Sequence, residues 1–172
     1  MPFGRRETIM TSRRFFLISG VAVAAAAAFR GFRPEAIAAE TFEVTKTDAE
    51  WKALLTSEQY QILRHEDTER PFTSALNTEK RKGTFHCAGC DLPVYSSETK
   101  YDSGTGWPSF WESLPNAVGK REDTSLFMTR TECHCSRCGG HLGHIFDDGP
   151  QPTGMRHCIN GMAMTFTPAS AA

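Results

Sequence analysis

Six cysteines are the residues of this 172-residue chain whose types and spacing point most directly to chemistry. Four of them form two C-x-x-C pairs, in "FHCAGC" and "CHCSRC": Cys87, Cys90, Cys135 and Cys138. Four thiolates on two tight turns suit a tetrahedral zinc ion, and such closed sites are structural. We therefore expect one structural zinc. Two disulfides or a redox C-x-x-C are the alternatives, whereas c-type haem needs a histidine directly after the second cysteine.

A fifth cysteine, Cys158 in "TGMRHCINGMAMTF", stands apart from both pairs. It follows a segment that contains His141, His144 and Asp148. A thiol with histidines and a carboxylate elsewhere in the chain forms a reasonable set of nucleophile and acid–base groups. The H-x-x-H spacing alone could instead indicate the zinc site of a hydrolase, but no third ligand is evident beyond Asp148.

The N-terminal part reads as an export signal. Arg13 and Arg14 precede an apolar run, and the small residues of Ala36-Ile37-Ala38 form a cleavage pattern. The stretch "SRRFFL" further resembles a twin-arginine signal, which directs export. We expect a signal peptide over 1–38, a single domain over 39–172 and a periplasmic location. The alternative is an uncleaved membrane anchor.

The domain expected over 39–172 is acidic and contains helices only at its start. It carries 13 Lys and Arg against 18 Asp and Glu, a net charge of −5. Because no basic stripe is present, nucleic acid is not an expected partner. Helical spacing covers 47–55 and 56–66, with a capping box from Thr56 to Gln59. From Gly83 onward, short β-prone segments alternate with turns, which predicts an α+β, mainly β domain.

Three long segments carry a family resemblance: "EWKALLTSEQYQILRHEDTERPF", "GTFHCAGCDLPVYSSETKYDSGTGWPSFWE" and "GGHLGHIFDDGPQPTGMRHCIN". Together they resemble the type B peptide methionine sulfoxide reductases, over about 47–166. Members of this family reduce the R epimer of methionine sulfoxide, the reversible oxidation product of methionine. The resemblance implies two packed antiparallel sheets with short flanking helices, thiol-dependent repair of oxidised proteins and, given the signal, repair of exported ones.

The resemblance also implies a role for each matching residue. Cys158 would attack the sulfoxide sulfur and become a sulfenic acid. Trp107 would pack on the substrate's methyl group. The remaining matches are a buried polar set around the substrate oxygen, His141, His144 and Asp148, and two supporting residues, Arg156 and Asn160. The four paired cysteines match a structural zinc site remote from the nucleophile.

One departure from the family concerns the recycling of Cys158. Many relatives carry a resolving cysteine where this chain has Thr105. The sixth cysteine, Cys133, is a buried strand residue near the zinc, a substitute resolving thiol or a spare reactive thiol. We expect an external, thioredoxin-like thiol to reduce Cys158, and a monomeric enzyme. The alternative of another class is a zinc-knuckle interaction module without catalysis.

Overall fold

The computed structural model describes residues 40–125 and 128–170. The predicted signal peptide and its cleavage site lie outside these residues. Within them, the structure contains no helix with the length and apolar character needed to cross a membrane.

Two short helices open the domain, as predicted. They are α1, Asp48–Leu54, and α2, Ser57–His65. The capping box predicted at Thr56 and Gln59 is present, and a second one links Thr47 to Glu50. Each cap satisfies backbone N–H groups that a helix start leaves unpaired, which contributes ~1 kcal/mol. Helix α2 buries its apolar side against β7 and η3.

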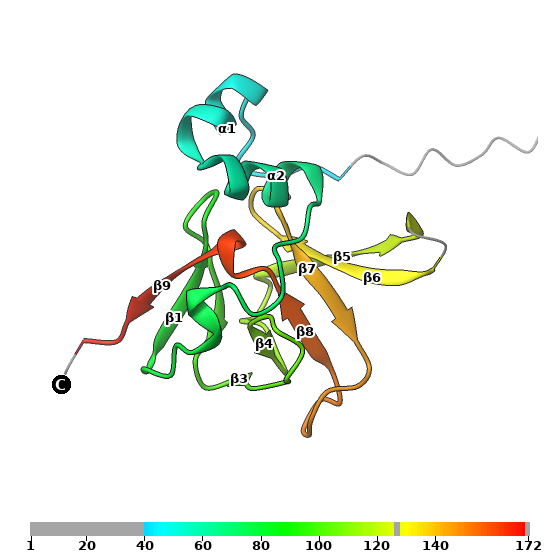
Figure 1. Ribbon diagram of the computed structural model, residues 1–172. Coiled ribbons are helices and arrows are strands. Elements are labelled where there is room, and N and C mark those ends of the chain that lie inside the picture. The colour runs from blue at the N-terminus through cyan, green and yellow to red at the C-terminus, as the bar shows by residue number, and fades with distance from the viewer. Residues whose placement is uncertain (1–39, 126–127, 171–172) are drawn as a thin grey trace, which may run out of the picture. The chain divides into compact units, whose positions relative to one another are not determined.

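In the described part of the chain, nine strands form two antiparallel sheets (Figure 1). The smaller sheet has the order β2-β1-β9 and the larger β3-β4-β8-β7-β6-β5. The bounds are β1 Gly83–Cys87, β2 Pro93–Ser96, β3 Lys100–Tyr101, β4 Ser109–Phe110, β5 Val118–Asp123, β6 Arg130–Cys135, β7 His141–Phe146, β8 Arg156–Ile159 and β9 Met164–Pro168. Two 3₁₀ turns, η1 Ala75–Asn77 and η3 Gly161–Ala163, complete the described elements. The predicted fold class is confirmed.

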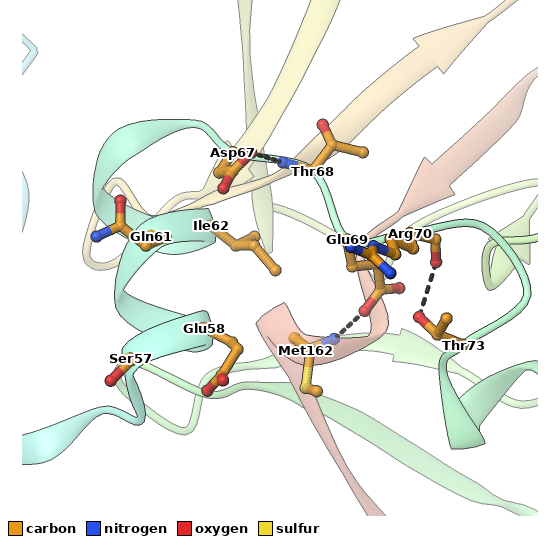
Figure 2. Close-up of a pocket in the computed structure, with 10 residues that line it drawn as sticks. All are labelled: Ser57, Glu58, Gln61, Ile62, Asp67, Thr68, Glu69, Arg70, Thr73 and Met162. Carbon is orange, nitrogen blue, oxygen red and sulfur yellow. Dashed lines mark hydrogen bonds between the residues drawn. The ribbon is translucent and has the colours of Figure 1, made fainter.

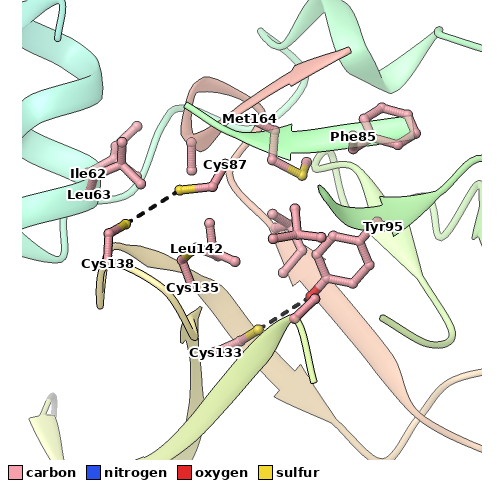
Figure 3. Close-up of a cluster of buried hydrophobic side chains, with 14 of the residues drawn as sticks. Ile62, Leu63, Phe85, Cys87, Tyr95, Cys133, Cys135, Cys138, Leu142 and Met164 are labelled. Carbon is pink, nitrogen blue, oxygen red and sulfur yellow. Dashed lines mark hydrogen bonds between the residues drawn. The ribbon is translucent and has the colours of Figure 1, made fainter. Parts of the chain in front are cut away.

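The core fills the space between the sheets. Tyr95 of the smaller sheet stacks on Phe110 of the larger one, with ring centroids 4.3 Å apart, and Phe85 meets Phe110 edge-on at 5.0 Å. These three rings are fully buried. Truncation of such a ring typically costs about 3–5 kcal/mol. The same layer extends to Ile62, Leu63 and the buried cysteines under α2 (Figure 3).

Alternation along β8 divides its residues between two environments. His157 and Ile159 face the core, where the Tyr95 hydroxyl lies 3.0 Å from His157 Nδ1. Successive strand residues point to opposite faces, so Arg156 and Cys158 lie on the other face. The core therefore holds β8 in a register that presents Cys158 away from the smaller sheet.

Candidate active site

One register row crosses all six strands of the larger sheet and contains Cys158. Directly paired residues of neighbouring strands have side chains on the same face. The row runs in sheet order through Tyr101, Ser109, Cys158, His144, Glu132 and Arg121. The sheet thus sets the predicted thiol directly beside the predicted histidine and a buried acid.

A cavity of about 140 Å³ lies above this row. Four of the predicted site residues line it: Trp107, His144, Cys158 and Asn160. Thr68, Arg130, Gly143 and Phe146 line the remainder. The structure therefore gathers the thiol, an indole, an imidazole and an amide around one small space, from segments far apart in the sequence.

Each predicted histidine is paired with a carboxylate that sequence reasoning had not selected. His141 Nδ1 lies 2.8 Å from Glu132 Oε1, and His144 Nε2 lies 2.8 Å from Asp123 Oδ2. Burial opposes the charge of Glu132, but hydrogen bonds with His141 and Arg121 lower its pKa to about 2. Hydrogen bonds with Ser125 and His144 hold the pKa of Asp123 well below its usual range.

Ionised carboxylates fix the tautomers of both rings. An ionised carboxylate only accepts hydrogen bonds, so His141 carries a proton on Nδ1 and His144 carries one on Nε2. Burial lowers the pKa of His144. His141 Nε2 is buried and has no hydrogen-bond partner within the described residues. One nitrogen on each ring remains for a ligand or a proton.

A β-bulge brings the two histidines to the same face. Residues three apart on a regular strand point to opposite faces. The pairing of β6 with β7 shifts register between Cys133–Gly143 and His134–His141, which makes Leu142 an extra residue. The rings of His141 and His144 consequently lie 5.3 Å apart. A Cβ on Gly143 would come within 2.1 Å of the Cys158 carbonyl oxygen, so this close strand approach requires glycine.

The surroundings of Cys158 act on its thiol in opposite directions. Burial raises the pKa of Cys158, whereas the Thr105 hydroxyl, 3.8 Å from the sulfur, and the positive charge of Arg156 lower it. Arg156 is bound by two nitrogens to Asp148, at 2.8 and 2.9 Å. Its guanidinium also covers the Phe146 ring at 4.3 Å from the centroid. Arg156 is thus held beside the thiol by a carboxylate and a ring.

Asp148 corrects one expectation. The resemblance placed it in a buried set around the substrate oxygen, but its side chain is 59% exposed and does not line the cavity. Its carboxylate instead accepts two hydrogen bonds from Arg156. His141 is buried and lines a different cavity, of about 290 Å³, together with His144.

Glu69, which sequence reasoning also missed, fixes two cavity residues. Its carbonyl accepts a hydrogen bond from Trp107 Nε1 at 3.1 Å, and its N–H donates to Asn160 Oδ1 at 3.0 Å. Its carboxylate accepts from the N–H groups of Gly161 and Met162. No local pattern around Glu69 signals these contacts, because all of its partners are distant in sequence.

The four paired cysteines converge, with their sulfurs all within 4.8 Å of one another. The sulfurs of Cys87 and Cys138 are 3.7 Å apart, and those of Cys90 and Cys135 are 3.5 Å apart. Tetrahedral zinc with bonds of ~2.3 Å separates its sulfurs by ~3.8 Å, whereas a disulfide requires about 2.05 Å. The site fits one zinc ion and not two disulfides. Among the described residues, no other group of three or more metal-binding side chains converges.

Comparison with known proteins decides the family. The SelR domain matches residues 55–168. The peptide methionine sulfoxide reductase MsrB of Agrobacterium fabrum is 53% identical over 127 residues, which is 73% of this chain and 94% of the relative. This chain belongs to the MsrB family of SelR-domain proteins. MsrB of Pseudomonas putida strain W619 is 52% identical over 131 residues, 76% of this chain and 98% of that protein. MsrB of Methanosarcina barkeri is 53% identical over 124 residues, 72% and 87% of the two chains.

Membership of the MsrB family confirms the resemblance predicted from the sequence. The SelR match spans both C-x-x-C pairs and the segment from His141 to Asn160. The interaction-module alternative loses its support, because the chain keeps the thiol, indole and imidazole of the cavity together.

Proposed function

We propose that this protein reduces the R epimer of methionine sulfoxide residues in exported proteins, with Cys158 as the nucleophile. The enzyme class, an oxidoreductase acting on methionine sulfoxide in proteins, follows from the MsrB family. The observation that best supports the nucleophile is the position of Cys158 in a cavity shared with Trp107, His144 and Asn160.

The first step transfers oxygen between two sulfurs. The Cys158 thiolate attacks the sulfoxide sulfur to form an S–S bond, and the sulfoxide oxygen takes up one proton. The S–O bond then breaks, the oxygen adds to the Cys158 sulfur as a hydroxyl group, and the S–S bond breaks. Methionine leaves, and Cys158 becomes a sulfenic acid. The methionine sulfur gains the two electrons that the cysteine sulfur loses. Thr105 and Arg156 support this step because both favour the thiolate, which is the attacking form.

The histidines supply the proton that the sulfoxide oxygen requires. His144 lies directly opposite Cys158 on the neighbouring strand. His141 contributes a buried Nε2 that has no hydrogen-bond partner in the described part of the chain, and its Nδ1–H donates to Glu132. A positioned general acid of this kind is worth roughly 10²–10⁴ in rate. Glu132 and Asp123 orient the two rings through these hydrogen bonds.

Trp107 accounts for the choice of epimer. Its indole is held by the Glu69 carbonyl, so its face is fixed relative to Cys158. An apolar wall accepts the methyl group of the substrate. With the methyl group, the thiolate and the acid in three fixed directions, only one configuration at the sulfoxide sulfur places its oxygen toward the histidines.

The zinc ion has a structural role in this proposal. Cys87, Cys90, Cys135 and Cys138 would hold it, and the bound metal would supply folding free energy. Protein sulfur would provide all four ligand positions, so no open position would remain for substrate. The four cysteines tie the β1 turn to the β6–β7 turn, which fixes the start of the strand that carries both histidines.

Two features support reduction of Cys158 by an external thiol. Cys158 is in register with His144, whereas Cys133 is in register with Gly143 and Ile159. Adjacent strand residues point to opposite faces, so the two thiols lie on opposite faces of one sheet. Cys133 is fully buried, near the Tyr95 hydroxyl, and burial raises its pKa to about 12.

The external thiol acts in two balanced steps. It attacks the sulfenic sulfur, which forms a mixed disulfide and releases water, and a second thiol then displaces Cys158. The proposed donor is a thioredoxin-like protein of the exported compartment. The export pattern at Arg13 and Arg14 supports that compartment. We also propose that the enzyme acts as a monomer.

Turnover of separated sulfoxide epimers by wild type and Cys158→Ser tests this proposal. The wild type should consume only the R epimer. Chiral chromatography of the remaining substrate measures this. The Cys158→Ser enzyme should lose turnover with unchanged zinc content, because a hydroxyl is a far weaker nucleophile than a thiolate. Equal consumption of both epimers, or substantial turnover by the purified variant, would contradict the proposal.

A further inference from the structure

A second cavity has a volume of about 430 Å³ (Figure 2). One side is helix α2, with Glu58 and Ile62, and the opposite side is η3, with Met162. The segment that leaves α2, from Asp67 to Arg70, closes the cavity. No step of the proposed reaction uses this space.

The second cavity adjoins the catalytic one. Thr68 lines both. The next residue, Glu69, binds the indole of Trp107 through its carbonyl and Asn160 through its N–H. If the oxidised methionine of a polypeptide lies against Trp107, a neighbouring residue of that polypeptide can therefore pass over Thr68 and enter the second cavity.

The lining of the second cavity combines an apolar floor with free carboxylates. Ile62 and Met162 provide the apolar part, and the Met162 side chain is 46% exposed. Glu58 and Asp67 are exposed. Neither forms a salt bridge with any residue of the described part of the chain. Arg70, the cation of the lining, lies beside Glu69 on the side away from α2 (Figure 2).

We propose that this cavity is a subsite for a lysine or arginine that flanks the oxidised methionine in the substrate chain. The inference rests on the proposed function, since it names the polypeptide that the same active site accepts. A long basic side chain can lay its methylene groups on Ile62 and Met162 while its charged end stays at the wet rim. There it meets Glu58 and Asp67. The net charge of −5 over 39–172 favours the approach of the same substrates.

Peptides with one R-methionine sulfoxide test the subsite. Lysine or glutamate is placed at the position before or after the sulfoxide, and kcat/KM is measured with excess dithiothreitol at low salt. In one of the two positions we expect lysine to be preferred over glutamate by ~3–10-fold, because the two exposed carboxylates attract the first side chain and repel the second. The preference should fall toward one at high salt, because exposed charges are screened.

Variants assign the preference to this cavity. For each variant, kcat/KM for every peptide is divided by kcat/KM of the same variant for a small substrate, N-acetyl-R-methionine sulfoxide amide. Glu58→Gln combined with Asp67→Asn should remove most of the lysine preference, while the hydrogen bond from the Thr68 N–H can still be accepted at position 67. Glu98→Gln, an exposed carboxylate that lines a different cavity, is the matched control and should keep the preference.

The outcomes separate the two proposals. If the wild type reduces the small substrate but treats lysine and glutamate peptides alike in both positions, the subsite is overturned and the reductase proposal stands. Equal loss of preference in the double variant and in Glu98→Gln also overturns the subsite, since a general field would then be the cause. If the wild type fails to reduce the small substrate, the reductase proposal itself is overturned.

Discussion

Replacing Glu132 by glutamine perturbs the buried acid under the proposed histidines. The side chain is 3% exposed and lies 2.8 Å from His141 Nδ1 and 2.5 Å from Arg121 Nε. Burial disfavours its charge, yet these two partners lower its pKa from 4.5 to about 2. Glutamine has the same shape as glutamate. Its amide NH₂ group, however, would face an N–H group of His141 or of Arg121, and two donors cannot form a hydrogen bond.

The size of the effect follows from the pKa shift. Because the folded-state pKa of Glu132 is depressed, its charge contributes stability that is fully present above the unfolded-state value of 4.5. This contribution is lost as the pH falls toward about 2. At 1.36 kcal/mol per pKa unit, the contribution at pH 7 is about 3 kcal/mol, and roughly half of it remains at pH 3.

Urea unfolding of wild type and Glu132→Gln between pH 3 and pH 7 measures this contribution. Zinc release in acid affects both proteins, so the difference between them isolates the carboxylate. We expect a difference of about 3 kcal/mol at pH 7 that shrinks toward pH 3. The exposed Glu98→Gln should stay within about 0.5 kcal/mol of wild type. A difference that is small at pH 7, or constant with pH, would refute the electrostatic reasoning.

Three further predictions concern Cys158, its neighbours and the zinc. Thr105→Cys should produce an intramolecular disulfide with Cys158 after one turnover, because the side chain at 105 already lies 3.8 Å from the sulfur; peptide mapping that shows only a sulfenic acid would contradict this. Because burial raises the pKa of Cys158, the rate of its alkylation by iodoacetamide should still increase with pH at pH 8.5. Arg156→Gln should shift this pH dependence of the alkylation rate to higher pH. A rate that reaches its plateau below pH 8 would contradict the raised pKa. Cys135→Ser should lose the metal and unfold at lower urea concentration, because the binding free energy of a structural zinc is folding free energy; metal loss with unchanged stability would contradict a structural role.

Structural features that depend on residues close together in the sequence were predictable. The capping box of α2 depends on Thr56 and Gln59, three residues apart, and it forms as expected. The two C-x-x-C pairs each place two sulfurs on one turn, so their convergence required only that the turns meet. The distribution of helices and strands followed from the change of periodicity near Gly83.

Features that depend on the pairing of distant segments were not predictable. The same-face position of His141 and His144 depends on a bulge at Leu142 that no local pattern announces. Glu132 becomes a partner of His141 only because β6 pairs with β7 in this register. The resemblance could name Asp148 but not its exposure, which follows from its ion pair with Arg156.

The most direct test of the account is the intact mass of the enzyme after a single turnover. The wild type is mixed with one equivalent of R-methionine sulfoxide peptide in the absence of reductant, and dimedone traps any sulfenic acid. We expect one equivalent of methionine and one dimedone adduct, mapped to Cys158, with four zinc-bound thiols unmodified. Methionine formed without a modification at Cys158, or a disulfide between Cys133 and Cys158, would contradict the account.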